Sequence, residues 1–377
     1  MKLKDCCLII AGQSPESKYY NTEGNGLPFF QGKADFGELY PTIRVYCSKP
    51  TKLAEKGDIL LSVRAPVGPT NLAPCTVCIG RGLTAIRPSN QLLTKYVLLF
   101  FRYFEAQLAA KGTGTTFKAI TQDVVKNLEI PVPPLTEQER IVARIEELFS
   151  QLDAGVETLK KTKAQLAVYR QAVLKEAFSS CLEKIPIKDI SSIVTSGSRG
   201  WASFYSDTGA RFIRITDLTR AGIELKNGNI QRVLLPEKAE GKRSRLCAGD
   251  VLVSITADLG SIGLVPDDIE EAYINQHIAM IRFKNSSRGK FMAWYLRSEW
   301  GQKDLLKNKR GGGKLGLGLD DIRSTSVPLV HNEEANRIVE FIDSRLSICN
   351  NIEHSVDSAL QQAEAMRQSI IKTAFME

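Results

Sequence analysis

The stretch ERIVARIEELFSQLD, residues 139–153, is repeated in outline as NRIVEFIDSRLSICN, residues 336–350, at an offset of 197 positions. The same offset aligns RQAVLKEAF from Arg170 with RQSIIKTAF from Arg367. One ungapped repeat therefore runs through residues 139–178 and 336–375, and its internal pattern decides the fold.

Apolar residues recur every seven positions in both copies. They are Ile145, Leu152, Leu159, Leu166 and Val173 in the first copy, and Ile342, Cys349, Val356, Ala363 and Ile370 in the second. A sustained seven-residue apolar repeat is typical of a coiled-coil seam. About 43 helical residues at 1.5 Å each make a rod of roughly 60 Å, which is longer than a small domain is wide. We therefore expect two long helices that pair antiparallel, in preference to two helices that each lie on their own domain.

The sequence also predicts how each helix begins. Pro133 and Pro134 disfavour helix before them, and Thr136 with Glu139 forms a capping-box pattern. In the second copy Asn332 is the predicted cap. Gly155 lies inside the first helix, where glycine costs about 1 kcal/mol relative to alanine and marks a possible bend.

The segments before the two helices correspond more loosely. LKD at Leu3 matches IKD at Ile187, GDILLS at Gly57 matches GDVLVS at Gly249, and AIR at Ala85 matches MIR at Met280, with offsets of 184, 192 and 195. Growing offsets indicate loop insertions in the second copy, while both copies keep the same framework of short strands. We expect an α+β protein with pseudo-twofold symmetry: mixed α/β domains at residues 1–133 and 181–330, and long helices within residues 134–180 and 331–377.

Charge is distributed unevenly along the chain. The net charge is +8, with +6 in residues 1–133, zero in 134–180, +6 in 181–332 and −4 in 333–377. Two basic globular blocks favour two polyanion-binding modules, although a generic basic soluble protein fits the same numbers. Eight cysteines without a framework spacing favour reduced thiols and a cytoplasmic location. The longest apolar run, YVLLFF from Tyr96, is far shorter than the roughly 20 residues that span a bilayer.

Catalytic signals are weak. Cys75 and Cys78 form half of a zinc-site pattern without a second half. Asp207 with Glu224 and Lys226 loosely resembles the acidic residues and lysine of metal-dependent nucleases. No glycine-rich cofactor motif lies between a strand and a helix, and no Asn-Pro-Pro-aromatic motif occurs. We expect no catalytic residue, no metal site and no cofactor in this chain.

The chain resembles the specificity subunits of type I restriction-modification systems along essentially its whole length. The resemblance lies in IPVPPLTEQERIVARIEELFSQLD from Ile130, YRQAVLKEAF from Tyr169 and RQSIIKTAF from Arg367. In the globular blocks, PFFQGKADFG from Pro28, GDILLSVRAPVGPTN from Gly57, CIGRGLTAIRP from Cys78 and GSRGWASFYSDTGARFIRITDL from Gly197 look like target-recognition domains.

The resemblance implies a non-catalytic DNA-specificity subunit. Each recognition domain would read one half of a split site in double-stranded DNA, and the helices would set the gap and dock two methyltransferase subunits. Endonuclease subunits that translocate DNA would join for cleavage. S-adenosylmethionine, ATP and Mg would belong to these partner subunits. Two other readings stay open: the specificity component of a related single-complex system of type IIB kind, and an interaction scaffold that does not bind DNA.

Candidate DNA contacts follow from residue chemistry. Arg and Lys pair with guanine edges and Gln with adenine, while cations beside glycine-rich turns suit phosphates. Two such turns are KGTGTTFK from Lys111 and KRGGGKLG from Lys309. The predicted contacts are Gln31, Lys33, Arg64, Lys111, Thr113, Thr115, Arg199, Trp201, Arg214, Lys242, Arg243, Arg245, Arg310 and Lys314. Each could instead be an ordinary solvated residue or a surface ion-pair partner.

Overall fold

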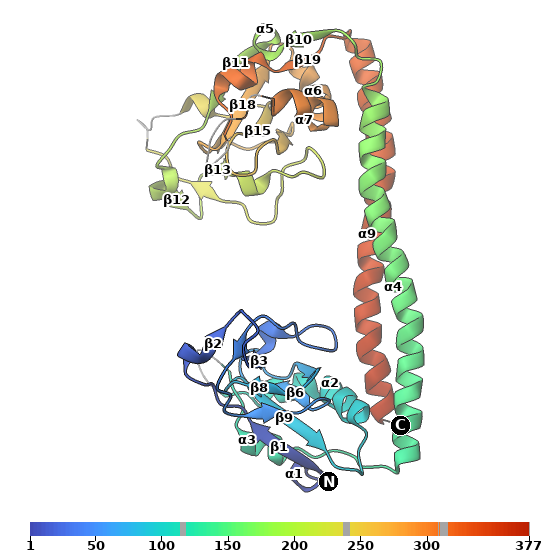
Figure 1. Ribbon diagram of the computed structural model, residues 1–377. Coiled ribbons are helices and arrows are strands. Elements are labelled where there is room, and N and C mark those ends of the chain that lie inside the picture. The colour runs from blue at the N-terminus through green and yellow to red at the C-terminus, as the bar shows by residue number, and fades with distance from the viewer. Residues whose placement is uncertain (114–117, 237–241, 308, 310–315, 377) are drawn as a thin grey trace. The chain divides into compact units, whose positions relative to one another are not determined.

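The computed structural model describes residues 1–113, 118–236, 242–307, 309 and 316–376 (Figure 1). The chain divides into two compact units, one comprising Met1–Leu159 with Ser358–Glu377 and the other Lys160–Asp357. Each unit holds one mixed domain of strands and short helices together with a part of each of two long helices. The predicted α+β fold class is therefore confirmed.

In the first unit, two sheets carry the domain. A four-stranded antiparallel sheet has the order β1 (Cys7–Ala11), β9 (Leu83–Pro88), β6 (Ile59–Ser62), β7 (Thr70–Leu72). A second sheet has the order β2 (Tyr20–Asn21), β4 (Tyr46–Cys47), β3 (Leu27–Phe30), β8 (Val77–Ile79), β5 (Leu53–Ala54), in which β3 and β8 are parallel. The helices are α1 (Leu3–Cys6), α2 (Thr94–Ala110) and α3 (Gln122–Lys126).

The second unit repeats this plan. Its antiparallel sheet has the order β11 (Ser191–Ser196), β18 (Ile278–Phe283), β15 (Val251–Ser254), β16 (Ile262–Leu264). The second sheet has the order β12 (Tyr205–Ser206), β14 (Arg232–Val233), β13 (Ala210–Ile213), β17 (Ala272–Ile274), and β13 is parallel to β17. A small sheet pairs β10 (Lys184–Pro186) with β19 (Ser326–Pro328), and the helices are α5 (Ile187–Ile190), α6 (Gly289–Arg297), α7 (Glu299–Leu305) and α8 (Leu319–Ser324).

The two long helices are α4 (Leu135–Ala177) and α9 (Asn332–Met376), and parts of them pack together in each unit. In the second unit Lys163 Nζ contacts Asp357 Oδ1 at 2.6 Å, and Arg170 Nη2 contacts Glu353 Oε2 at 2.7 Å. Residue numbers rise along α4 as they fall along α9, so the helices are antiparallel, as predicted. In the first unit Arg367 pairs with Asp153 and its guanidinium lies 5.0 Å from the centre of the Phe149 ring.

The residues of the seven-residue repeat lie on the inner faces of these helices. Seven are buried and three are half-buried; the buried ones are Ile145, Leu166, Val173, Ile342, Cys349, Val356 and Ala363, and the half-buried ones Leu152, Leu159 and Ile370. Burying one apolar stripe on each helix supplies the stabilisation that a helix of this length lacks in isolation.

The helix starts differ from the predictions. The capping box at Thr136 is wrong, because α4 already begins at Leu135 and the amides of residues 137 and 138 both donate to the Pro134 carbonyl. Asn332 does not cap α9 either: it is the first helical residue, and its side-chain oxygen accepts a hydrogen bond from Arg288 Nε at 2.9 Å. Helix α4 continues without interruption through Gly155.

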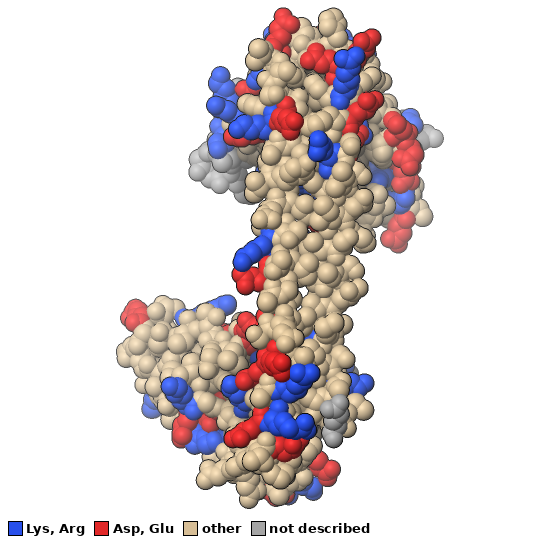
Figure 2. Space-filling view, turned by 90° about the vertical axis from the view of Figure 1, so that its right-hand side faces the viewer, with Lys and Arg blue, Asp and Glu red and all other residues tan. Residues whose placement is uncertain are grey.

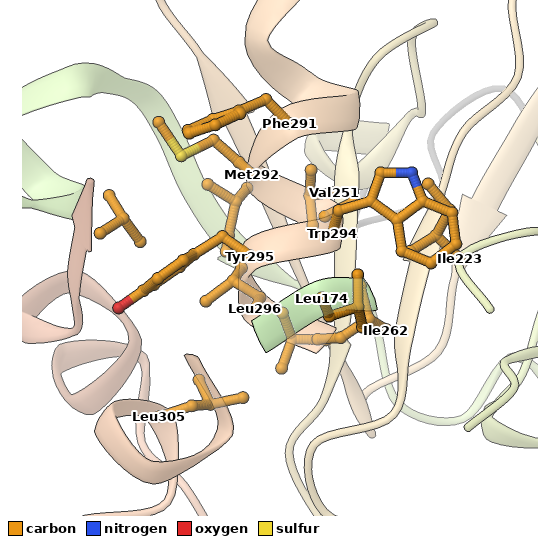
Figure 3. Close-up of a cluster of buried hydrophobic side chains, with 14 of the residues drawn as sticks. Leu174, Ile223, Val251, Ile262, Phe291, Met292, Trp294, Tyr295, Leu296 and Leu305 are labelled. Atoms are coloured by element: carbon orange, nitrogen blue, oxygen red, sulfur yellow. The ribbon is translucent and has the colours of Figure 1, made fainter. Parts of the chain in front are cut away.

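Each long helix ends on an aromatic cluster of a domain. Phe178, just after α4, packs edge to face against Phe291 and Tyr295 of α6, with ring centres 5.5 and 5.3 Å apart. Figure 3 shows this core of the second unit, in which side chains of α6 and α7 meet Leu174 from α4. The equivalent residue of α9, Phe375, packs on Tyr96 and Tyr103 of α2 in the first unit. The repeated phenylalanine therefore anchors a helix end to a domain core in both units.

Candidate nucleic-acid interface

Three loops of the first unit surround a cavity of about 620 Å³. They follow β3, β6 and β8. Because β3 and β8 run parallel, their carboxyl ends lie at the same edge of the sheet, which brings the first and third loops together. Three predicted DNA contacts, Gln31, Lys33 and Arg64, line this cavity. Arg81, which sequence reasoning did not select, lines it as well.

The loop after β3 is held by a carboxylate. The backbone amide of Gln31 donates to Asp35 Oδ2 at 3.1 Å. This bond closes a turn that leaves the Gln31 and Lys33 side chains exposed. Behind them, the rings of Tyr20 and Phe29 stack with centres 4.7 Å apart, and burial raises the pKa of the Tyr20 phenol. The cavity therefore combines an aromatic wall with exposed polar and cationic side chains.

The glycine-rich turn of the first unit begins and ends beside Arg64. The backbones of Thr113 and Ala119 exchange hydrogen bonds of 3.0 and 2.9 Å, and Ala119 also forms a β-bridge with Arg64. Lys111 is exposed, with its ammonium 5.7 Å from the centre of the Phe104 ring. Thr115 lies outside the described residues. Lys111, at the start of the turn, and Arg64, at the rim of the cavity, thus lie on neighbouring segments.

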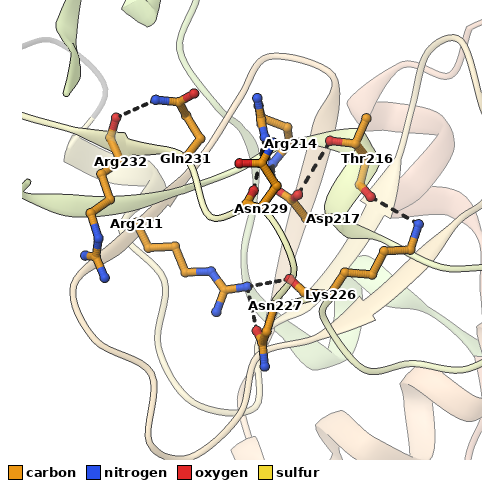
Figure 4. Close-up of polar contacts among 9 residues, drawn as sticks. All are labelled: Arg211, Arg214, Thr216, Asp217, Lys226, Asn227, Asn229, Gln231 and Arg232. Atoms are coloured by element: carbon orange, nitrogen blue, oxygen red, sulfur yellow. Dashed lines mark hydrogen bonds and ion pairs between the residues drawn. The ribbon is translucent and has the colours of Figure 1, made fainter. Parts of the chain in front are cut away.

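In the second unit Arg214 occupies the place of Gln31. It follows β13, its amide donates to Asp217 Oδ2 at 2.7 Å, and its Nη2 donates to the Asn229 carbonyl at 3.3 Å (Figure 4). Arg211, three residues earlier and within β13, is buried and donates to the Lys226 carbonyl and to Asn227 Oδ1. Arg214, which follows the strand, is therefore partly exposed, whereas Arg211 within the strand is structural.

Trp201 does not lie on the surface. The residue is 5% exposed, and its ring packs against Phe212 and Tyr273, with ring centres 5.7 and 5.4 Å away. The structure therefore places Trp201 in the core beside the second sheet, where it cannot reach a base edge. The sequence did not reveal this burial, because it depends on residues that are distant in sequence. Arg199, two residues earlier, is exposed.

The remaining predicted cations are distributed as follows. Arg243 and Arg245 are exposed, and the Arg245 backbone forms a β-bridge with Tyr273 at the edge of the second sheet. Lys242 begins the short 3-10 helix η5 (Lys242–Ser244). Arg310 and Lys314 lie outside the described residues. The described end of their turn, Gly316, forms a β-bridge with Thr256, as Ala119 does with Arg64 in the first unit.

Sequence reasoning missed a polar cluster in the second unit. Thr256 Oγ1 lies 2.6 Å from His277 Nδ1, and Gln276 Nε2 lies 2.8 Å from His277 Nε2. The sequence held one signal for this cluster. The offset of 195 between AIR at Ala85 and MIR at Met280 aligns Gln276 with Arg81, which lines the cavity of the first unit.

Metal ligands do not gather in the described part of the chain. Among these residues no group of three His, Cys, Asp or Glu side chains is placed to hold a metal ion. Lys226, one of the three residues with nuclease-like spacing, donates a hydrogen bond from its Nζ to the Thr216 carbonyl at 3.2 Å.

No helix of the described chain is long and apolar enough to cross a bilayer. On the face drawn in Figure 2, basic and acidic side chains are interspersed.

The comparisons with known proteins agree with this duplicated architecture. The family model for the type I restriction modification DNA specificity domain matches residues 1–167 and again residues 182–362. The MjaX specificity subunit of Methanocaldococcus jannaschii is 41% identical over 167 residues, which cover 44% of this chain and 38% of that protein. The EcoBI specificity subunit of Escherichia coli is 25% identical over 317 residues, which cover 74% and 65%. The chain thus spans less than two thirds of each relative.

A solved structure has the same fold. It is described as the structural basis underlying complex assembly and conformational transition of the type I R-M system. It is 19% identical, covers 100% of this chain and 96% of that chain, and has a TM-score of 0.76. Because the family model matches most of the chain, in two copies, the protein belongs to the family of type I restriction modification DNA specificity domains.

Proposed function

We propose that the chain is the non-catalytic, sequence-reading subunit of a type I restriction-modification complex, in which each domain reads one half of a split DNA site. The observation that carries the proposal is the repeated loop arrangement. In each unit, a carboxylate-closed turn follows the strand that pairs parallel to its neighbour, with Gln31 in one and Arg214 in the other. One chain with two equivalent loop sets would recognise two short sequences.

The chemistry of the loops suits DNA. Lys33, Arg64 and Arg81 give the cavity of the first unit cations that would neutralise phosphates or donate to guanine edges, and Gln31 would suit adenine. In the second unit Arg199, Arg214 and Arg243 supply similar groups. Phosphate contacts would fix the register on the duplex, and contacts to base edges would supply specificity.

The long helices would act as a spacer. Helix α4 has 43 residues and α9 has 45, so each is about 65 Å long at 1.5 Å per residue. DNA repeats about every 34 Å, so a rigid spacer would permit only certain gaps between the half-sites.

The helices would also dock two methyltransferase subunits. In the second unit the helix surface exposes Val168, Tyr169, Ile348 and Ile352. In the first unit a shallow groove of about 220 Å³ runs past Gly155. Exposed apolar side chains on a helix pair would suit a protein interface.

The catalytic chemistry would belong to the partners. We expect S-adenosylmethionine in the methyltransferase subunits, and ATP and Mg in endonuclease subunits that also translocate DNA, all acting in the cytoplasm. The chain itself would contribute sequence recognition and assembly.

The test is base-resolved sequencing of methylated adenine. DNA from cells that carry this chain with its methyltransferase is compared with DNA from cells that lack this chain. We expect a split motif, with two short specified halves around a fixed unspecified gap, only when the chain is present. A continuous motif, or a motif that persists without the chain, would contradict the proposal.

A further inference from the structure

Arg81 and Gln276 occupy equivalent positions in the two units. In the first, Phe30 of β3 pairs with Ile79 of β8, and the Gly80 amide donates to the Phe30 carbonyl at 2.8 Å. Arg81 is the next residue. In the second unit, Ile213 of β13 pairs with Ile274 of β17 and the next amide, that of residue 275, donates to the Ile213 carbonyl at 3.1 Å. Gln276 is the residue after that.

Arg81 is available to a ligand. It is exposed and lines the same cavity as Gln31 and Arg64. Its backbone is anchored, because its amide donates to Ser14 Oγ at 3.2 Å. Within the described residues, no hydrogen bond or ion pair engages its guanidinium group. A forked guanidinium on an anchored backbone suits the O6 and N7 acceptors of guanine in the major groove.

Gln276 is oriented by its neighbour. An amide nitrogen can only donate, so Gln276 Nε2 donates to His277 Nε2 at 2.8 Å, and the ring proton must be on Nδ1. That proton is donated to Thr256 Oγ1 at 2.6 Å. The Gln276 amide keeps its carbonyl oxygen and a second N–H, and this pair matches the N6 donor and N7 acceptor of adenine.

We propose that Arg81 and Gln276 are matched base-reading residues, one per unit, with Arg81 specifying a guanine in one half-site and Gln276 an adenine in the other. His277 is a positioning residue, which holds the Gln276 amide edge through its bond to Thr256. The inference rests on the proposed function of the two domains. It adds which position of each domain faces a base and which base that position prefers.

The experiment determines the methylation motif for variants of the chain in cells with its methyltransferase. We expect Arg81→Ala to lose preference at one guanine of one half-site, and Gln276→Ala at one adenine of the other. Each loss should be about 5- to 150-fold, and the opposite half-site should stay fully specified. Each variant is thus the control for the other, and Gln171→Ala, at an exposed position of α4, should change neither half.

Two further variants test the chemistry. Glutamate accepts but does not donate, so Gln276→Glu should replace adenine by cytosine at that position. His277→Ala should weaken the preference at the same position, and adding it to Gln276→Ala should cause no further loss there. A merely structural role of His277 would instead add to the loss or lower the total methylation.

The outcomes separate the two claims. No motif with the unmodified chain would overturn the proposed function and this inference with it. A split motif that neither Ala variant alters would overturn the inference alone. If an Ala variant abolishes methylation, the motif is determined instead for Arg81→Lys and Gln276→Glu. Retention of adenine at the Gln276 position by the glutamate variant also overturns the inference.

Discussion

The Asp58 carboxylate accepts two hydrogen bonds from Arg87, from Nε at 2.8 Å and from Nη2 at 2.9 Å. Arg282 binds Asp250 in the same way in the second unit, at 2.8 and 2.6 Å. Each aspartate directly precedes a central strand, β6 or β15, and each arginine lies on the neighbouring strand, β9 or β18. Each Asp–Arg pair therefore holds the start of β6 or β15 against its neighbouring strand. Arg64 and Thr256 lie just beyond the other ends of these two strands.

Replacing either arginine should destabilise its own domain. Asp58 is 3% exposed and Asp250 is 1% exposed, so Arg87→Ala or Arg282→Ala leaves a buried carboxylate without its counter-ion. Such a loss costs on the order of 3 kcal/mol. Urea unfolding should show a decrease of this size for both variants.

The control is an exposed ion pair in the same unit as Arg87. Lys18 contacts Glu16 at 2.6 Å, but both side chains are more than half exposed. Lys18→Ala should lower the free energy of unfolding by less than about 1 kcal/mol. An equal effect of Lys18→Ala and Arg87→Ala would show that the buried pair contributes no special stability.

The helix seam predicts a contrast between two isoleucines of α9. Ile342 is fully buried, whereas Ile352 is 41% exposed. Ile342→Ala removes buried methylene groups and leaves a cavity, which should cost about 2–5 kcal/mol. Ile352→Ala should cost well under half of that. Both values come from urea unfolding of the chain, and similar losses would contradict the observed helix register.

Gly155 predicts a stabilising substitution. A Cβ atom at this position of α4 would meet no atom within 4 Å. Gly155→Ala should therefore raise the free energy of unfolding by up to about 1 kcal/mol, through helix propensity alone. Gly26→Ala is the contrasting case, because Gly26 has φ +96° and its Cβ would clash with the Cys47 carbonyl oxygen. A loss of stability in Gly155→Ala would indicate that the glycine is needed for another purpose.

The sequence was most informative where the determining contacts repeat along the chain. The seven-residue spacing from Ile145 to Val173 placed one apolar residue on the inner face at every second turn, and the matching spacing from Ile342 supplied its counterpart. Seam residues can be predicted in this way because each helical face follows from local periodicity. The two mixed domains followed from the offset between GDILLS and GDVLVS.

The site was less predictable because its loops meet through strand pairing across long separations. Arg81 joins Gln31 at one edge only because Phe30 pairs with Ile79, about fifty residues away. The sequence predicted Trp201 as a DNA contact, but Phe212 and Tyr273 bury it. Side-chain type identified candidates, and tertiary packing decided which of them face solvent.

Cysteine reactivity should follow burial. Burial raises the pKa of the Cys7 thiol to about 12, so at pH 8 only about one molecule in ten thousand carries the reactive thiolate. Cys247 is exposed. Brief iodoacetamide treatment at pH 8 followed by mass spectrometry should label Cys247 and spare Cys7. In urea both should react, and labelling of native Cys7 at the rate of Cys247 would contradict its burial.

The salt dependence of DNA binding should distinguish a phosphate contact from a base contact in the first unit. Each phosphate neutralised by a lysine releases counterions, and contributes about 0.9 to the slope of log affinity against log salt concentration. Lys111 begins the turn whose ends lie beside Arg64, so Lys111→Ala in the assembled complex should lower this slope by about 0.9 and leave the methylation motif unchanged. Lys56→Ala is the matched control, since the exposed Lys56 precedes β6 while Arg64 follows it. An unchanged slope for Lys111→Ala would remove this lysine from the phosphate contacts, and a changed motif would make it a base-reading residue instead.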